Sequence, residues 1–445
     1  MTSRLILFEV TIVDRLQLFP ITTTIEKNSL TIAGQALALL VENYGTPLYL
    51  YDRATMDHAA TGYKSALASR YPAAASVTYA GKAFLNTAIA QWTQFHNLFV
   101  DCTGEGEIAM ALAGGVPREH ILVHGVNKSI ADLKSAIQHA GTLVVDNLTE
   151  LDHIADLFTA SSSQFLNLWL RLLPGLAVET HHAHTQTGQH DSKFGMTREE
   201  ILEAAQVCKD HKLPLNGIHF HQGSNFRDAS PLQAAIELGL AIAKEISFKD
   251  EWHFSPGGGW GVAYHEDELP QPDINEYVNM IAENVLEGCK TRGLVLPHLH
   301  LEPGRSLVAR AGVAVYRVGA IKRRGDKVWI LTDGGMTDNP RYAMYGARYS
   351  CLTVSDPGRE KSEKVSIAGP YCESGDVIIE NLLMPKIEEG ELIAIPASGA
   401  YHLSMSSNYN GSRKPAVLWL EKERVKIIMR RETIEDLLKR DFNIS

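Results

Sequence analysis

The sequence has few cysteines and no long hydrophobic run, and both absences exclude classes of protein. Its cysteines, Cys102, Cys208, Cys289, Cys351 and Cys372, form no Cys-x-x-Cys pair and no even framework, which argues against a disulfide scaffold and favours a reducing compartment. No apolar stretch approaches the roughly 18 residues of a membrane span. The segment from Met1 to Pro20 lacks the residue order of a signal peptide. We therefore expect a cytoplasmic protein without a membrane partner.

Positive charge is also scarce. The chain has 42 lysines and arginines against 52 aspartates and glutamates, so its net charge is −10. This balance argues against a nucleic-acid-binding protein or a basic membrane-surface protein. The one dense basic cluster, Lys322-Arg323-Arg324, is short and typical of a solvated turn. The 445 residues, 45% of them hydrophobic and 21% charged, are enough for two or three ordinary globular domains.

From Ser76 onward, short apolar strands alternate with amphipathic helices. The predicted strands are 76–80, 97–101, 120–124, 142–146, 166–171, 215–220, 251–255 and 298–302. Helical stretches such as 108–113, 129–140, 199–212 and 231–245 separate them. Eight strands, each followed by a helix, predict a (β/α)₈ TIM barrel over residues 46–305.

The pattern changes after Ser306, where glycines and alternating strands dominate. The predicted strands are 313–321, 327–332, 377–380, 391–396, 416–421 and 424–429, and a helix at 433–440 follows them. Alternating strands of this kind predict a C-terminal antiparallel β domain over residues 306–445.

Reactive or polar residues follow the predicted barrel strands, where a TIM barrel holds its active site. They include Lys82, Asp101, Asp146, Arg171, His219, His221, Ser224, Gly257-Gly258-Gly259, Glu302 and Arg305. Lys82 lies between the apolar residues Ala80 and Phe84, and a lysine partly shielded from water there is a candidate amine nucleophile. On its own, such a lysine is more often a solvated loop residue.

The triple glycine lets the backbone approach an anion, and Ser224 and Arg305 can donate to the same group. The alternative interpretation is a tight turn without a ligand. Phosphate sites in barrels often lie on the loops after strands seven and eight, which favours phosphate here. A lysine amine, a phosphate cradle and an acid such as Glu302 together indicate pyridoxal 5′-phosphate, with His221 against the ring face. An isolated histidine at this position is otherwise most often a core residue.

The histidines leave a second interpretation open. His219-x-His221 and His298-x-His300 are paired along strands, and His181, His182, His184 and His190 gather in one segment. Metal-dependent barrel hydrolases also place histidines at strand ends. The long histidine-rich segment is more typical of a solvated loop, so a metal-dependent TIM-barrel hydrolase is the remote alternative.

Several motifs resemble the barrel-fold (type III, alanine-racemase-like) pyridoxal-phosphate decarboxylases, and most closely their diaminopimelate-decarboxylating branch. The motifs are Tyr79-Ala80-Gly81-Lys82-Ala83, His221-Gln222-Gly223-Ser224, Gly257-Gly258-Gly259, Glu302-Pro303-Gly304-Arg305-Ser306, Cys372-Glu373-Ser374-Gly375-Asp376 and Gly399-Ala400-Tyr401. The resemblance covers nearly the whole chain. It implies that residues 1–45 pack with the β domain and that the protein is a homodimer with shared active sites.

The resemblance also implies a role for each matching residue. Lys82 resembles the Schiff-base lysine, His221 the ring-stacking histidine and Glu302 the partner of the pyridine nitrogen. The implied cofactor ligands further include Ser224, Gly257, Gly258, Gly259, Gly304, Arg305 and Tyr401. The implied substrate ligands are Arg305, Arg341, Tyr345, Glu373 and Tyr401. Cys372 and Glu373 resemble residues contributed across a dimer interface, and Cys372 or Lys82 is the expected proton donor.

The expected reaction is decarboxylation of meso-2,6-diaminopimelate to L-lysine and CO₂. Glu373 can pair with the distal ammonium of this substrate and Arg341 with its distal carboxylate. Relatives of the ornithine, lysine or arginine type, or a decarboxylase of a D-amino acid, are the alternative. A catalytically silent relative is disfavoured by the intact Lys82, Cys372 and Glu373, and a racemase by Glu302.

Overall fold

The computed structural model describes residues 12–158, 166–176, 188–248, 251–422 and 424–444. The chain divides into two compact units. The β unit contains the chain up to Met56, Val262–Pro272 and the chain from Val308 onward, and the barrel unit contains Asp57–Gly261 and Asp273–Leu307. Within the described residues, no helix is long and apolar enough to cross a membrane.

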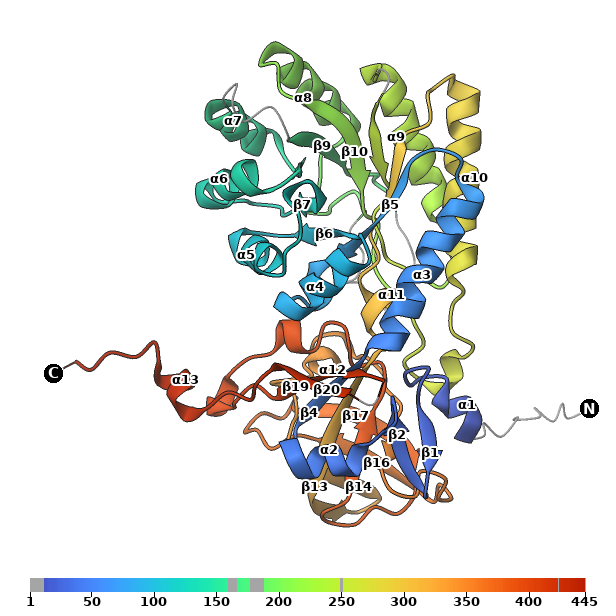
Figure 1. Ribbon diagram of the computed structural model, residues 1–445, viewed down its shortest axis with the longest axis vertical. Coiled ribbons are helices and arrows are strands. Elements are labelled where there is room, and N and C mark those ends of the chain that lie inside the picture. The colour runs from blue at the N-terminus through green and yellow to red at the C-terminus, as the bar shows by residue number, and fades with distance from the viewer. Residues whose placement is uncertain (1–11, 159–165, 177–187, 249–250, 423, 445) are drawn as a thin grey trace, which may run out of the picture. The chain divides into compact units, whose positions relative to one another are not determined.

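The barrel unit is built on a closed sheet of parallel strands in the order β10-β11-β12-β5-β6-β7-β8-β9 (Figure 1). The strands are β5 (Ala75–Ala80), β6 (Phe99–Cys102), β7 (Ile121–Val123), β8 (Thr142–Val145), β9 (Asn167–Leu172), β10 (Leu215–Phe220), β11 (His253–Ser255) and β12 (His298–Leu301). All four residues of β8 are buried, because helices cover the outside of the barrel and side chains fill its inside. The predicted barrel is confirmed.

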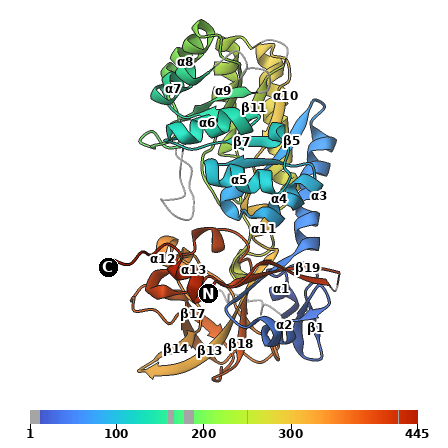
Figure 2. The same ribbon diagram turned by 60° about the vertical axis from the view of Figure 1, so that its left-hand side comes forward.

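Helices connect the strands and surround the barrel. They are α3 (Arg53–Arg70), α4 (Thr87–Phe95), α5 (Glu105–Ala113), α6 (Ile130–His139), α7 (Leu148–Leu157), α8 (Arg198–Asp210), α9 (Leu232–Ile246) and α10 (Ile274–Arg292). Figure 2 shows α5 to α8 in succession along the outside of the strands. Side chains fix where they begin: Asn86 caps α4, and Ser129 forms a capping box with Asp132 at α6. The short helix α11 (Arg305–Val308) follows β12.

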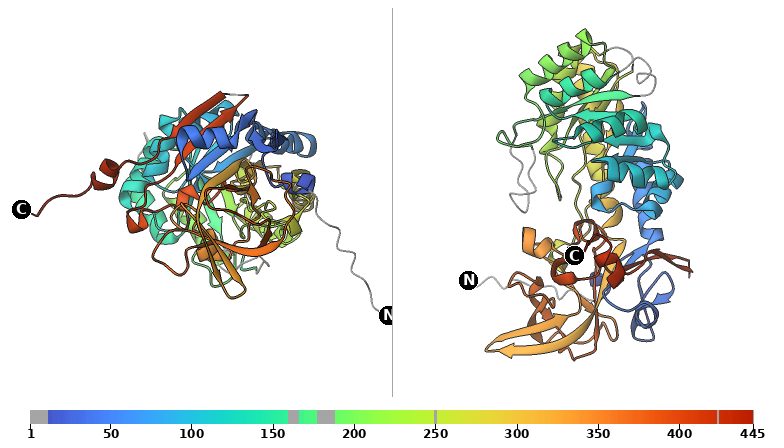
Figure 3. Two further views of the ribbon diagram at one scale, coloured as in Figure 1. Left: turned by 90° about the horizontal axis from the view of Figure 1, so that it is seen from below. Right: turned by 90° about the vertical axis from the view of Figure 1, so that its left-hand side faces the viewer.

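The β unit contains a large sheet with strand order β17-β16-β14-β13-β4-β19-β20, to which β18 and β15 are attached. Its strands are β4 (Leu48–Asp52), β13 (Gly312–Arg324), β14 (Lys327–Thr332), β15 (Leu352–Thr353), β16 (Glu363–Ala368), β17 (Val377–Met384), β18 (Leu392–Ile395), β19 (Ala416–Glu421) and β20 (Arg424–Met429). Strand β4, from the N-terminal part of the chain, pairs with β13 and β19, and Figure 3 shows this blue segment among the orange and red C-terminal strands.

The sheet is mixed rather than purely antiparallel. The pairs β14–β16 and β4–β19 are parallel, whereas the other pairs of this sheet are antiparallel. Strand β16 was not predicted, because the segment starts with charged residues and only its last four residues are buried. The predicted strand at 377–380 continues to Met384. Asn381 takes a left-handed conformation (φ 57°), which forms a β-bulge after which the strand continues.

Smaller elements complete the β unit. They are α1 (Ile12–Leu16), α2 (Leu37–Tyr44), α12 (Arg341–Tyr345), α13 (Ile434–Leu438) and the three-stranded sheet of β1 (Thr24–Glu26), β2 (Ser29–Ile32) and β3 (Gln35–Ala36). One apolar core joins side chains from both ends of the chain, including Leu50, Val313 and Leu418. Burial of this core holds the N-terminal segment onto the C-terminal sheet.

Candidate active site

Lys82 lies just beyond the carboxyl end of β5, in the 3₁₀ turn η1 (Gly81–Ala83). Only glycine fits before it, because a Cβ on Gly81 would lie 2.6 Å from the backbone oxygen of Asp101. The prediction that Lys82 is partly shielded from water is wrong for this structure. Ala83 and Phe84 are buried, whereas Lys82 itself is exposed.

Glu302, at the carboxyl end of β12, is buried and closely surrounded by donors. Its Oε1 accepts a 2.6 Å hydrogen bond from the Ser255 hydroxyl, and its Oε2 lies 3.2 Å from Nε2 of His219 and 3.6 Å from Nε2 of His124. Burial alone raises the pKa of Glu302, but His219, His124 and Ser255 hold it well below its usual value. Glu302 is therefore an ionised carboxylate in the interior.

Asp101, at the end of β6, has the opposite protonation state. Burial raises the pKa of Asp101 to about 8, the charge of Glu302 adds to this effect and the charge of Lys82 opposes it. Burial therefore favours the protonated form of Asp101, whereas the donors around Glu302 favour its ionised form. Burial is the main cause of the lowered pKa of His124, His219 and His221, and the charge of Lys82 adds to it, which associates its ammonium with this group of side chains.

His221 follows β10 and is held as a neutral ring. Burial lowers its pKa well below the usual value, and the charges of Lys82 and Arg171 lower it further. The Gly258 N–H donates to its Nδ1 across 3.3 Å. Both members of the His219-x-His221 pair therefore contribute to this end of the barrel, His219 through Glu302 and His221 through the glycine loop.

The triple glycine after β11 makes a close backbone approach that larger residues would prevent. A Cβ on Gly258 would lie 2.0 Å from the backbone oxygen of Glu302, and one on Gly259 would lie 2.5 Å from that of Gly223. Gly257 (φ 74°) and Gly259 (φ 114°) also take left-handed conformations that favour glycine. The tertiary contacts therefore require glycine at all three positions of this loop.

Two donors lie on neighbouring loops. Nη2 of the buried Arg305 donates to Oγ of Ser224 across 2.9 Å, which leaves the Ser224 proton for another acceptor. Gly304 precedes Arg305 with its Cα close to Ala80 and Ala83. A hydroxyl and a guanidinium beside a glycine loop suit a phosphate, and a lysine and an ionised acid suit a pyridoxal ring. The residues present fit pyridoxal phosphate.

The remaining predicted site residues belong to the β unit. Nη1 of Arg341, in α12, donates to the Tyr349 hydroxyl across 2.6 Å, and its guanidinium lies 4.6 Å from the centre of the Tyr264 ring. Tyr345 ends α12, and Tyr401 has a left-handed backbone (φ 61°).

Cys372 and Glu373 lie in an exposed loop of the same unit. The Cys372 N–H donates to Oδ1 of Asn410 across 3.1 Å, and Oε1 of Glu373 accepts from the Gly375 N–H across 3.3 Å. Both side chains of this pair therefore face outward from the β unit rather than into its core.

Sequence reasoning missed two residues of the barrel site. His124 follows β7 directly, and Ser255 ends β11, so their positions at strand ends were the available signal. Asp146 and Arg171, which were noted at strand ends, form an ion pair of 3.4 Å. His181, His182 and His184 lie outside the described residues, and His190 is exposed.

Comparisons with known proteins identify the family of this chain. Residues 55–309 match the family of the pyridoxal-dependent decarboxylases, specifically its pyridoxal binding domain. Diaminopimelate decarboxylase from Bacillus subtilis is 39% identical over 431 residues, which cover 93% of this chain and 95% of that protein. The enzyme of the same name from Synechocystis is 34% identical, and the match covers 95% of this chain and 92% of that protein.

Solved structures show the same fold. The crystal structure of diaminopimelate decarboxylase from M. jannaschii in co-complex with L-lysine has a TM-score of 0.87 and 29% sequence identity, and the match covers 95% of this chain and 98% of that one. The family match, the sequence identity and the fold thus all indicate the same family. The chain belongs to the family of pyridoxal-dependent decarboxylases, enzymes whose cofactor is pyridoxal phosphate.

Proposed function

We propose that this protein removes one carboxyl group from meso-2,6-diaminopimelate and releases L-lysine and CO₂, the last step of lysine biosynthesis. The names of its relatives from Bacillus subtilis and Synechocystis support this substrate. So does its likeness to a decarboxylase crystallised with L-lysine, the product of the proposed reaction.

The observation that carries the proposal is the environment of Arg341. Its side chain is 7% exposed, and among the described residues no carboxylate lies within 4.0 Å of its guanidinium. Tyr349 and Tyr264 orient the guanidinium without neutralising it. A buried guanidinium held in this way suits a carboxylate supplied by a ligand. Diaminopimelate has such a distal carboxylate, and ornithine and lysine do not.

The residues of the barrel unit supply the cofactor's surroundings in this proposal. Lys82 would hold the cofactor through its amine, and Ser224, the triple glycine, Gly304 and Arg305 would bind its phosphate, with Tyr401 of the β unit as a further ligand. When bound, pyridoxal phosphate accepts the electron pair left on the substrate by the departing CO₂. Glu302, whose neighbours favour its ionised form, would hold the ring nitrogen protonated. His221, neutral and fixed by Gly258, would cover one face of the ring.

The remaining steps need residues of the β unit. We assign Glu373 to the distal ammonium of the substrate, with Tyr345 and Tyr401 as further donors. Cys372 or Lys82 would then return a proton to the substrate Cα after CO₂ has left. Because Cys372 and Glu373 are exposed on the β unit, they suit a role in the active site of a second subunit of a homodimer. All cysteines of the described residues are free, which suits a cytoplasmic enzyme.

The experiment that tests the proposal compares the purified protein with its Lys82→Ala variant. Each is loaded with pyridoxal phosphate, its visible absorption is recorded, and CO₂ and lysine are measured after addition of meso-diaminopimelate. We expect a visible band and lysine formation for the natural protein and neither for the variant. Turnover of ornithine, arginine or a D-amino acid without turnover of diaminopimelate would refute the substrate and keep the cofactor. A protein that stays colourless with added cofactor would refute both.

A further inference from the structure

A second cluster of histidines lies in the barrel, at the opposite ends of its strands from Lys82 and Glu302. His253 is the first residue of β11, His298 is the first residue of β12, and His300 is two positions further along β12. His253 and His298 are direct neighbours in the parallel register of the two strands. The His298-x-His300 pair, which the sequence suggested for the active-site end, therefore lies at the amino end of the barrel.

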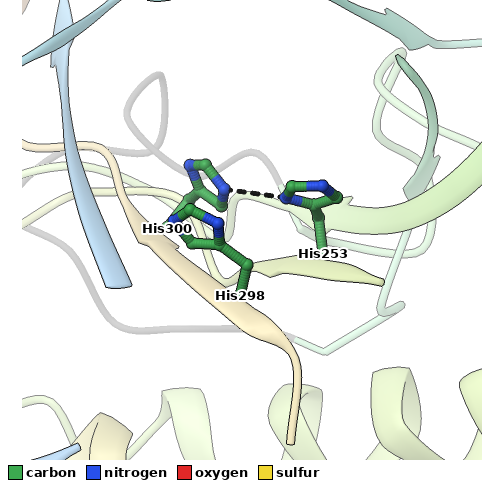
Figure 4. Close-up of side chains that lie close together, drawn as sticks. All are labelled: His253, His298 and His300. Carbon is green, nitrogen blue, oxygen red and sulfur yellow. Dashed lines mark hydrogen bonds between the residues drawn. The ribbon is translucent and has the colours of Figure 1, made fainter. Parts of the chain in front are cut away.

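The three rings face one another (Figure 4). One nitrogen from each ring can be chosen so that all three lie within 4.8 Å of one another. Nδ1 of His253 and Nε2 of His300 are 3.0 Å apart. Two imidazole nitrogens bound tetrahedrally to a zinc ion at about 2.0–2.1 Å lie about 3.3 Å from each other. In this structure the two nitrogens of His253 and His300 share a hydrogen bond, and an ion bound by both would replace the shared proton at a distance close to that of two zinc ligands.

The third ring is oriented by a neighbour in the way that metal ligands usually are. Nε2 of His298 lies 2.7 Å from the Ser76 hydroxyl on β5, which leaves Nδ1 of His298 for the cluster. Hydrogen bonds of this kind to the second nitrogen fix the tautomer of a ligating histidine. The rings of His298 and His300 are stacked, with centroids 4.3 Å apart, and binding an ion requires them to splay so that both lone pairs point at one atom.

His300 is the buried member of the cluster and has an unmet polar atom. Its side chain is 1% exposed, and its Nδ1 has no hydrogen-bond partner. The rings of Trp169 and Phe99, from β9 and β6, contact His300 at centroid distances of 4.7 and 5.3 Å. Contacts from these strands place His300 inside the barrel.

We propose that His253, His298 and His300 form a binding site for a divalent transition metal of the zinc type, which joins β11 to β12 at the amino end of the barrel. Three imidazoles with no carboxylate among them suit zinc rather than magnesium or calcium, which prefer oxygen ligands. His253 and His298 are half-buried, so water can complete the coordination. The site lies apart from the cofactor residues, and its role is to stabilise the barrel.

The test uses the full chain loaded with pyridoxal phosphate, so that His124, His219 and Glu302 stay covered by the cofactor. After treatment with a chelator, the protein is titrated with zinc, and bound zinc is counted by elemental analysis. Cobalt is then substituted, and its visible absorption is recorded as a measure of tetrahedral nitrogen coordination. We expect one zinc per chain, a rise in melting temperature with zinc, and a tetrahedral cobalt spectrum.

Five variants locate the ion. His253→Gln and His298→Gln should lose the zinc, and Ser76→Ala should weaken its binding by roughly 10- to 100-fold because the orientation of His298 is lost. The exposed His190→Gln is the matched control and should bind like the natural protein. A triple variant, His181→Gln/His182→Gln/His184→Gln, tests the other histidine-rich segment.

Two results would overturn the proposal. One is a holoenzyme that binds no zinc. The other is an ion bound elsewhere, shown by zinc binding that survives His253→Gln and His298→Gln or by zinc binding that is lost in the triple variant. If the glutamine variants fail to fold, Ser76→Ala and the cobalt spectrum of the natural protein still decide the matter. Because the readout is metal content, it is independent of whether the enzyme accepts diaminopimelate.

Discussion

The two buried carboxyl groups of the barrel site, Glu302 and Asp101, differ in protonation because their neighbours differ. Glu302 lies beside two histidines and accepts a hydrogen bond from a hydroxyl, whereas Oδ1 of Asp101 has no hydrogen-bond partner and lies 3.8 Å from Nε2 of His124. A carboxylate with several donors is stabilised in its charged form, and a carboxyl without them keeps its proton. The charged partner that a protonated pyridine ring requires is therefore Glu302 and not Asp101.

The first prediction concerns Arg341. We expect Arg341→Met to lower kcat/KM for meso-diaminopimelate about 10- to 150-fold, because a hydrogen bond to a charged group contributes about 1.5–3 kcal/mol. Most of the loss should appear in KM, since the guanidinium binds a carboxylate that does not react. Steady-state kinetics measure it.

Arg348→Met is the matched control for Arg341. Arg348 is exposed and pairs with Asp267 at 2.8 Å, so its loss should leave the kinetics unchanged. Equal kinetics for the two variants would show that Arg341 does not bind the substrate.

At the scale of single elements, the glycine loop after β11 is the most tightly constrained connection of the site. We expect Gly258→Ala to reduce the pyridoxal phosphate retained per chain and to destabilise the fold by about 1–3 kcal/mol, because the added Cβ meets the Glu302 backbone oxygen and the loop must shift. Cofactor content after gel filtration and urea unfolding measure the two effects.

Gly106→Ala provides the comparison for Gly258→Ala. Gly106 lies in α5, where a Cβ would meet nothing within 4 Å, and alanine should stabilise the helix slightly. If both variants retain the cofactor equally, the glycine loop does not form the phosphate site.

In the β unit, a buried polar network links strands β4 and β13 to the loop around Asp338. Tyr49 donates to Oδ2 of Asp338 across 3.0 Å, Tyr316 donates to the same oxygen, and His402 contacts Tyr49. Burial raises the pKa of Asp338 to about 6, although the hydrogen bonds from Tyr316, Gly335 and Tyr49 oppose the rise. The folded protein therefore holds this proton more tightly than the unfolded chain.

This shift predicts a pH-dependent difference between Asp338→Asn and the natural protein. A carboxyl whose folded pKa is raised contributes stability below pH 4, and that contribution is lost as pH rises to about 6. Asparagine does not ionise, so the variant should gain relative stability over this interval, by about 2–3 kcal/mol for a shift of roughly two pKa units. Urea unfolding at pH 4.5 and at pH 7.5 measures the change.

The comparison between the two proteins removes the contribution of every other titrating group that they share. A difference in unfolding free energy that stays constant between the two pH values would contradict the assignment of the raised pKa to Asp338.

At the scale of the whole molecule, the exposed positions of Cys372 and Glu373 bear on assembly. If these residues complete the site of a second subunit, Lys82→Ala and Cys372→Ala are defective in different halves of a shared site. Random mixing of the two inactive proteins should then restore about one quarter of the natural activity, because half of the dimers are mixed and each has one intact site. Activity is assayed after dissociation and reassembly at equal concentrations.

Lys82→Ala mixed with Glu302→Gln is the control. Both residues lie in the barrel unit of one chain, so no mixed dimer contains an intact barrel site. If the first mixture also stays inactive, Cys372 acts within its own chain or not at all.

The sequence determined the barrel and most of its chemistry. Strands buried on both faces read as short apolar runs, and the residue after each run, such as Lys82 or Glu302, necessarily lies at one end of a parallel barrel. The motifs around these residues also sufficed to indicate the family. These features are local, because each is a property of one strand and the loop that follows it.

The tertiary structure decided what depends on register and closure. It paired β4 with β13 and β19, made two strand pairs of the β unit parallel, and exposed Lys82 at its turn. It also placed His124 beside Glu302 and His253 beside His300. Residues far apart in the chain meet only when the sheet closes with one register, and a single sequence carries no local signal for that choice.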